Sequence, residues 1–290
     1  MILSKGDAME AARPGRSVEV EAIALDGNAQ SRKYDRVVTE EPLELRLAAG
    51  GTQRTLAVTM RTPGNDFELA GGFVYGEGII RRHDEIAELT YCIDPAVDPA
   101  QRYNIVTIEL RAGRAAPDFA RFERHFTISS ACGVCGRAQL ESLRELGAAP
   151  IVDGVCVAAE LLYKLPERMR EAQRTFATTG GLHAAALFDE RGDMVALRED
   201  VGRHNAVDKV VGWALLNGQL PARRRILLVS GRASYEILQK AVMAGIPIVA
   251  SVSAPSSLAV DLAREFNVTL AGFVRGERAN LYAASERIAG

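Results

Sequence analysis

The C-terminal half of the chain alternates short apolar runs with amphipathic helical segments, and this alternation restricts the possible folds most strongly. The pattern first predicts a hairpin at 183–197 that turns at 189–193. The segments predicted after it are helix 207–215, strand 226–229, helix 235–244, strand 248–252, helix 258–266 and strand 268–270. Strands that alternate with helices in this way predict a sheet with parallel neighbours, covered by helices.

The first half of the chain is instead rich in strand-like runs. Alternating or β-branched residues predict strands at 18–25, 43–47, 55–60 and 103–110. One helix interrupts these strands after Asn65, a residue type that suits a helix N-cap. Gly71 and Gly72 lie inside this helix and lower its intrinsic stability, so close packing or a ligand must compensate.

Together these patterns predict an α+β protein in which a strand-rich N-terminal part precedes a three-layer α/β domain. The expected divisions are a flexible tail at 1–16, a strand-rich domain at 17–128, a cysteine loop with a following helix at 129–150, and an α/β domain at 151–290.

Composition excludes several classes of protein. A formal net charge of -2 gives no overall attraction to nucleic acid or anionic lipid, so an anionic ligand needs a local basic cluster. No apolar run is long enough to cross a bilayer, and residues 1–16 lack the apolar centre of a secretory signal. The 4 cysteines are too few for a disulfide scaffold, so we expect reduced thiols in the cytoplasm.

The most distinctive short motif is Cys132-Gly133-Val134-Cys135-Gly136. Two thiols two residues apart can share chemistry, since one can attack or carry sulfur while the other resolves or relays it. The glycines after both cysteines free the backbone to turn amide N–H groups toward a sulfur anion. This pattern favours a thiolate nucleophile, with no preference between Cys132 and Cys135.

Half of a zinc site is the structural alternative for this pair. Tetrahedral zinc needs four ligands, and no second close pair follows, so Cys156, His125 or His183 would have to be recruited singly. A thioredoxin-like oxidoreductase fits less well, because its pair opens a helix early in the chain.

Polar, glycine-bearing segments follow or precede most of the predicted C-terminal strands, and in such sheets ligands bind at the carboxyl ends of the strands. Hydroxyls, backbone N–H groups and arginines in these segments suit phosphate and nucleotide groups. The candidate binding residues are Thr178, Thr179, Gly180, Gly181, Asp200, Arg203, His204, Ser230, Gly231, Arg232, Phe273, Val274, Arg275, Gly276, Glu277 and Arg278.

Plainer interpretations stand beside these candidates. A tight turn before the strand at His183 explains Thr178 to Gly181 nearly as well, and surface arginines are common. Arg203 and His204 open a helix, where cations are unfavourable unless an anion lies nearby. Asp208 and Lys209 are expected to form a solvated ion pair.

Four ordered segments resemble the formate dehydrogenase accessory sulfurtransferase family, known as FdhD, from about residue 62 to residue 282. They are Thr62-Pro63 with the following helix, Ser-Ser-x-Cys-Gly-x-Cys-Gly at 129–136, Glu-Asp-Val-Gly-Arg-His-Asn-Ala-Val-Asp-Lys at 199–209, and Gly-Phe-Val-Arg-Gly-Glu-Arg at 272–278.

The resemblance implies a function. Members of this family take sulfur from a cysteine desulfurase as a persulfide and pass it to the bis-guanine-dinucleotide molybdenum cofactor, which then serves formate dehydrogenase. It implies that Cys132 is the persulfide carrier of a sulfurtransferase, and that Cys135 is a second carrier or releases sulfide by forming a disulfide. It also implies a homodimer and a cytidine-deaminase-like fold for the cofactor-binding domain at 151–290.

Deaminase chemistry is not expected with that fold. Such enzymes hold zinc through His-x-Glu and Pro-Cys-x-x-Cys, whereas His183 is followed by two alanines and the second motif is absent. We therefore expect no metal ligands. The rival functions are a non-catalytic chaperone that only holds the molybdenum cofactor for formate dehydrogenase, and a zinc-dependent nucleotide hydrolase.

Overall fold

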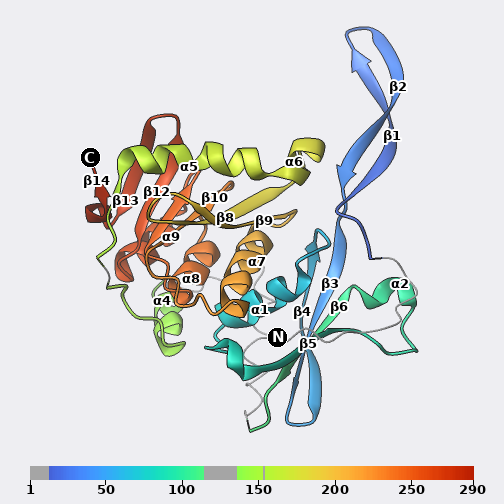
Figure 1. The fold of residues 1–290 in the computed structure, drawn as a ribbon, viewed down its shortest axis with the longest axis horizontal. Coiled ribbons are helices and arrows are strands. Elements are labelled where there is room, and N and C mark those ends of the chain that lie inside the picture. The colour runs from blue at the N-terminus through green and yellow to red at the C-terminus, as the bar shows by residue number, and fades with distance from the viewer. Residues whose placement is uncertain (1–12, 114–135, 153) are drawn as a thin grey trace.

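The computed structural model describes residues 13–113, 136–152 and 154–290, with no account of the side chains at 136–139. Its larger sheet has, within these residues, the strand order β13-β12-β11-β10-β8-β9 (Figure 1). The strands of this sheet are β8 (His183–Asp189), β9 (Met194–Asp200), β10 (Arg225–Val229), β11 (Ile248–Ser251), β12 (Thr269–Arg275) and β13 (Arg278–Ala283).

Helices cover both faces of this sheet (Figure 1). One face packs against α5 (Ala159–Ala172), with α6 (Arg174–Thr179) continuing along the same side. The other face packs against α7 (Arg203–Leu216), α8 (Tyr235–Met243) and α9 (Ser257–Glu265). Alternation along a strand explains the two layers: in β8, Ala186 and Phe188 contact the α5 side, while Ala185 and Leu187 contact the α7 side.

The strand directions confirm the predicted parallel core and add antiparallel strands at its margins. Strands β10, β11 and β12 are parallel neighbours, as the alternation of strands and helices predicts. The predicted hairpin forms as β8 and β9, and β8 pairs antiparallel with β10. At the opposite margin, β13 pairs antiparallel with β12, because only a tight turn separates them. The cytidine-deaminase-like detail of the fold stays a prediction.

The strand-rich N-terminal part is confirmed. Within the described residues, a second sheet has the order β4-β3-β6-β5 and contacts α1 (Asp66–Gly76). The strands here are β3 (Glu41–Ala49), β4 (Thr52–Arg61), β5 (Ile86–Tyr91) and β6 (Ile105–Leu110). The ribbon of β1 (Ser17–Asp26) and β2 (Ala29–Val38) projects from the rest of the molecule (Figure 1). The shorter elements are η1 (His83–Glu85), α2 (Pro99–Arg102), α4 (Gly136–Glu145), β7 (Val157–Ala158), η2 (Ser285–Arg287) and β14 (Ile288–Ala289).

Helix α1 begins after Asn65, as predicted, but the side chain of Asn65 does not cap the helix. Asn65 has a left-handed backbone (φ 59°), and its side chain makes no capping hydrogen bond to the helix. Its side-chain oxygen instead accepts a hydrogen bond from Arg16 Nη2 at 2.5 Å, which fastens the segment before β1. No helix in the described part of the chain is both long and apolar enough to span a bilayer.

Candidate functional site

The carboxyl-terminal edge of the larger sheet brings together several segments that the sequence predicts for binding. His183 at the start of β8 pairs with Asp200 at the end of β9. The backbone N–H of Ser230, just after β10, donates to the Ala184 carbonyl at 2.9 Å. A bridge between Ala233 and Pro255 joins the loops that follow β10 and β11. Segments far apart in sequence therefore meet at this edge, as the topology of parallel strands requires.

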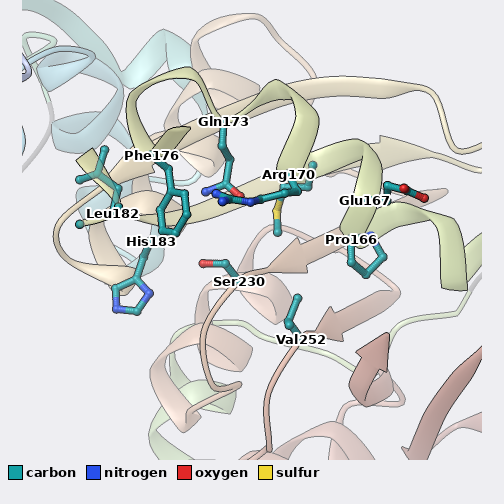
Figure 2. Close-up of a pocket in the computed structure, with 12 residues that line it drawn as sticks. Pro166, Glu167, Arg170, Gln173, Phe176, Leu182, His183, Ser230 and Val252 are labelled. Carbon is teal, nitrogen blue, oxygen red and sulfur yellow. The ribbon is translucent and has the colours of Figure 1, made fainter. Parts of the chain in front are cut away.

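A pocket of about 780 Å³ opens between this edge and helices α5 and α6 (Figure 2). Gly180, Gly181 and Ser230 line it, and all three are predicted binding residues; Leu182 and His183, which follow the two glycines, line it as well. The lining that sequence reasoning missed includes Arg170, Phe176, Met169 and Val252. Its walls are thus apolar and aromatic with a few polar groups, which is the usual character of a small-molecule site.

Arg170 and Phe176 form the most specific wall of the pocket. The guanidinium carbon of Arg170 lies 4.0 Å from the centre of the Phe176 ring, in cation–π contact. Buried Glu199 holds this wall in place, because its carboxylate accepts hydrogen bonds from the backbone N–H groups of Thr175 and Phe176 at 3.1 and 2.8 Å. The carboxylate thereby caps the first turn of α6.

Positive charge gathers where α7 begins at the same edge. The first turn of α7 holds Arg203 and His204 and no acidic residue. The buried Nε of Arg203 has no hydrogen-bond partner among the described residues. Burial, and then the charges of Arg203 and His204, lower the pKa of His183 below its usual range. A helix N-terminus that carries Arg203, with its buried Nε unpartnered, favours an anionic ligand.

His204 also reaches the next helix. Its Nε2 atom lies 2.8 Å from Glu236 Oε2 and 3.1 Å from Ser234 Oγ, both at the start of α8. The pKa of Glu236 is lowered mainly by its hydrogen bond to His204. A Cβ added at Gly231 would lie 3.4 Å from His183 Nδ1, so this loop backbone lies close to the His183 ring. Arg232 is exposed beside it.

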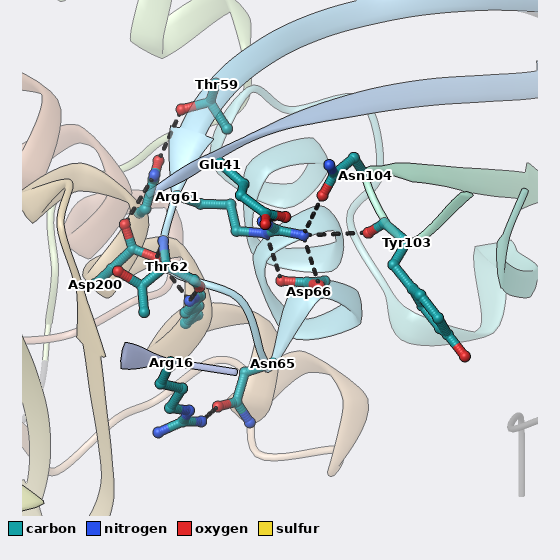
Figure 3. Close-up of polar contacts among 12 residues, drawn as sticks. Arg16, Glu41, Thr59, Arg61, Thr62, Asn65, Asp66, Tyr103, Asn104 and Asp200 are labelled. Atoms are coloured by element: carbon teal, nitrogen blue, oxygen red, sulfur yellow. Dashed lines mark hydrogen bonds and ion pairs between the residues drawn. The ribbon is translucent and has the colours of Figure 1, made fainter. Parts of the chain in front are cut away.

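Asp200 lies beside the pocket and not in it. Its carboxylate is fully buried, forms a 2.6 Å ion pair with Lys209, and accepts hydrogen bonds from the backbone N–H groups of Gly202 and Thr62. Figure 3 shows Asp200 beside Thr62. Every oxygen is therefore occupied by the protein itself. We assign Asp200 a positioning role, in which it ties the start of α7 to the end of β4.

The expectation of a solvated pair between Asp208 and Lys209 is wrong. Both side chains are buried, and each has another partner. Lys209 pairs with Asp200 and donates to the Thr62 carbonyl at 2.8 Å, while Asp208 lies 2.7 Å from Lys240 Nζ. Neighbouring residues on a helix point in different directions, which is why adjacency in sequence misled.

Thr178 and Thr179 are used by the helix that carries them. Their hydroxyls donate to the Thr175 carbonyl at 3.0 and 2.8 Å, and neither residue lines the pocket. Gly180 ends α6 with a left-handed backbone (φ 67°). The threonines therefore belong to the end of α6, whereas the predicted turn before His183 begins at Gly180, and both glycines border the pocket.

Residues 273–278 span the end of β12, the two-residue turn at Gly276 and Glu277, and the first residue of β13. Strand β12 continues past its last pairing with β11, and the Phe273 N–H donates to the Ser253 carbonyl at 3.1 Å. Val274 is buried in the core, while the rest of the segment is exposed: Phe273, Arg275, Gly276, Glu277 and Arg278. The turn lies at the same edge as the pocket but is not part of its lining. Its role in binding stays a prediction.

Cys132 and Cys135 lie outside the described residues, so their predicted role, and the zinc alternative, stay predictions. Helix α4 begins at Gly136, directly after this pair. The two cysteines that the structure describes are free thiols: Cys92 is buried and Cys156 is exposed.

Fold and site define a mixed α/β protein with a partly apolar pocket at the carboxyl edge of its main sheet, beside the cationic start of α7. A family model described as FdhD/NarQ matches residues 38–289. The chain belongs to this family.

Individual relatives agree. The chain is 52% identical over 269 residues to the sulfur carrier protein FdhD of Streptomyces coelicolor, covering 92% of this chain and 94% of that protein. It is 48% identical over 258 residues to the protein of the same name from Mycobacterium tuberculosis, covering 88% and 92%. A crystal structure described as a formate dehydrogenase accessory protein, from Desulfotalea psychrophila, is similar with a TM-score of 0.73 and 25% identity, covering 95% of this chain and 100% of that one.

Proposed function

We propose that this protein is a sulfur carrier for formate dehydrogenase, in which Cys132 carries persulfide sulfur to a guanine-dinucleotide molybdenum cofactor. The names of its relatives support sulfur transfer in the service of formate dehydrogenase. The persulfide, the cysteine desulfurase that donates it, the cofactor as bound substrate, a homodimer and a cytoplasmic location are the finer parts of the proposal.

The observation that carries the proposal is the pocket beside the start of α7. The Arg170 guanidinium carbon lies 4.0 Å from the centre of the Phe176 ring, and guanidinium donors are suited to O6 and N7 of a guanine. Arg203, at the start of α7, supplies a positive charge that suits the phosphates of the same nucleotide, and the lowered pKa of His183 keeps that side chain neutral beside it. A guanine nucleotide would thus bind with its base toward α5 and α6 and its phosphates toward α7.

The sulfur chemistry balances with two thiols. The Cys132 thiolate attacks the terminal sulfur of the donor persulfide, forms a new S–S bond and releases the donor thiolate. Cys135 then attacks Cys132 Sγ, which closes a disulfide and expels sulfide for the molybdenum of the bound substrate. Cellular thiols reduce the disulfide for the next cycle. Binding in the pocket would hold the substrate in one orientation for this transfer.

Calorimetry with GDP tests the pocket. Arg170→Ala should weaken GDP binding by about tenfold, because a charge-assisted hydrogen-bond donor is lost. Arg191→Ala is the matched control, since Arg191 is exposed in the turn at the opposite end of β8. Equal GDP affinity in the wild type and Arg170→Ala would exclude the pocket as the nucleotide site.

Mass spectrometry tests the carrier. After incubation with a cysteine desulfurase and cysteine, the peptide that contains Cys132 should gain the mass of one sulfur. Cys132→Ala should still bind GDP but fail to activate a co-expressed formate dehydrogenase, whereas the control Cys156→Ala should behave as the wild type. Full activation by Cys132→Ala would instead support the non-catalytic chaperone.

A further inference from the structure

The β1–β2 ribbon is the least covered part of the described structure (Figure 1). Its ten residue pairs run from Ser17 opposite Val38 to Asp26 opposite Ala29. Among the described strands, β1 and β2 pair only with each other. An isolated two-stranded ribbon is marginally stable in water, and its free edges present unpaired N–H and C=O groups.

Large apolar side chains are concentrated on this ribbon. Near its tip, Ile23, Leu25 and Tyr34 share one face and are 65%, 72% and 74% exposed. Val18, Val20 and Val37 are exposed on the other face, nearer the base. Six of the twelve exposed large hydrophobics in the described residues therefore lie on the 22 residues from 17 to 38. Such a concentration marks an interaction surface.

Four of the charged side chains on the ribbon form two ion pairs within it. Arg32 forms a 3.1 Å ion pair with Glu21, and Lys33 forms a 3.0 Å ion pair with Asp35. Glu19 lies directly opposite Arg36 in the strand register. The ribbon therefore offers apolar side chains and backbone edges and carries almost no net charge, so it does not select an acidic or a basic partner.

The base of the ribbon adjoins the pocket. A Cβ added at Gly181 would lie 3.1 Å from Val38 Cγ1, and Gly181 lines the pocket. Strand β2 also contacts helix α6, which carries Phe176. A protein that grips the ribbon would thus be held next to the mouth of the site where the nucleotide is proposed to bind.

We infer that the β1–β2 ribbon is the docking arm for the acceptor protein, the dehydrogenase that receives the sulfurated ligand. This inference rests on the proposed function. The acceptor would bind through an apolar surface of almost no net charge, either covering the tip face or adding a strand to a free edge.

The size of the ribbon favours a short-lived acceptor over a permanent second copy of this chain. A ten-residue strand is about 34 Å long and a two-stranded ribbon about 10 Å wide, so one face offers on the order of 350 Å². Stable complexes bury about 800 Å² on each partner, roughly twice that area. A transfer of cargo requires the acceptor to dissociate, and a small apolar contact permits this.

Direct binding of the apo-dehydrogenase tests the inference. The Leu25→Glu/Tyr34→Glu double variant places charge on the tip face and should raise the Kd for immobilised apo-dehydrogenase by about tenfold or more. Its GDP affinity and its sedimentation coefficient should stay unchanged. Val152→Glu is the matched control, because Val152 is 86% exposed and lies outside the ribbon.

Each contrary outcome is distinct. An unchanged Kd in the double variant would overturn the docking arm. A dimer that dissociates in this variant while the dehydrogenase still binds would assign the ribbon to a second copy and also overturn it. Failure of the wild type to bind the apo-dehydrogenase would remove the proposed partner together with the arm. Absence of persulfide on Cys132, with binding intact, would contradict the proposed function and leave the arm standing.

Discussion

Individual buried charges determine how the start of α7 is held. Asp200 and Lys209 form an ion pair that is almost completely removed from water, and burial lowers the pKa of Lys209 below its ordinary value. Thr62, on the segment after β4, contributes both its N–H and its carbonyl oxygen to this pair. The pair therefore links the strand-rich part of the chain to the start of α7, beside the pocket.

Lys209→Met should be strongly destabilising. The substitution keeps the length of the side chain but leaves Asp200 buried without its counter-charge, which costs about 3–5 kcal/mol of the free energy of unfolding. Urea denaturation measures the change. Asp84→Asn is the control, because the ion pair of Asp84 with Arg82 is exposed, and it should leave stability unchanged. Equal stability of Lys209→Met and the wild type would show that the pair contributes nothing.

Asp208 should titrate at an unusually high pH. Burial raises the pKa of its carboxyl from 3.8 to about 6, although Lys240 opposes the shift and Glu77 reinforces it. A raised carboxyl pKa means that the folded state binds a proton more readily than the unfolded state does. The stability from this group is therefore complete below pH ~4 and is lost as the pH rises through ~6.

Carbon NMR of labelled aspartate side chains checks this prediction. One carboxyl signal should titrate with a midpoint near 6 and should vanish in Asp208→Asn, which assigns it. Exposed Asp35, whose pKa is lowered mainly by its hydrogen bond to Lys33, is the internal reference at low pH. A set of aspartate signals that all titrate below pH ~5 would contradict the prediction.

The residue types of the pocket were more predictable from sequence than their roles. Gly181, His183 and Ser230 lie in segments that the polar motifs indicate, and they do line the pocket. The role of Asp200 could not be predicted, because its partner Thr62 lies 138 residues away in sequence. Arg170 and Phe176 carry no motif, since a break between α5 and α6 separates them and their contact forms only in three dimensions.

Helices α1 and α7 cross with their backbones in contact. A Cβ at Gly72 would lie 1.9 Å from the Asp208 carbonyl oxygen, and one at Gly212 would lie 1.7 Å from the Glu68 carbonyl oxygen. Each glycine thus permits the backbone of one helix to touch that of the other. Close packing, the first of the two compensations expected for the glycines of α1, is confirmed at Gly72.

Gly72→Ala should separate the two helices and destabilise the protein by about 3 kcal/mol, the upper end of the usual cost of overpacking. Gly71→Ala is a matched control on the same helix, since its Cβ would meet Leu215 Cδ2 at an ordinary 3.6 Å. That control should leave stability unchanged or raise it slightly through better helix propensity. Thermal denaturation of the two variants measures both effects, and similar melting temperatures would disprove the role of the crossing.

Helices and strands themselves were largely predictable from hydrophobic periodicity, because each signal is local. The hairpin β8–β9 and the parallel strands β10, β11 and β12 follow the predicted segments closely. The contact of α1 with α7 was not predictable, since a glycine that needs close packing does not identify its partner. The ribbon β1–β2 was anticipated only as the strand at 18–25, and its projection away from the core has no signature in the sequence.

Over the whole chain, one apolar core joins the strand-rich part to the α/β part. Buried residues of β3 and α1, such as Leu45 and Leu69, belong to the same cluster as Val210 of α7 and Val249 of β11. The domain boundary expected near residue 128 stays a prediction. Because the core crosses that boundary, the two parts depend on each other for burial.

The protein should accordingly unfold in a single cooperative step. Trp213, the one tryptophan of the sequence, lies on α7 and packs against this shared core, so its fluorescence reports on the junction. Far-UV circular dichroism reports on both parts at once. The urea midpoints from the two signals should coincide, because loss of α1 would expose the apolar face of α7 and destabilise the larger sheet.

A fragment of residues 151–290, which lacks α1, should for the same reason fail to show a cooperative transition. Two separated midpoints, or cooperative unfolding of that fragment, would show that the α/β part is stable without the strand-rich part.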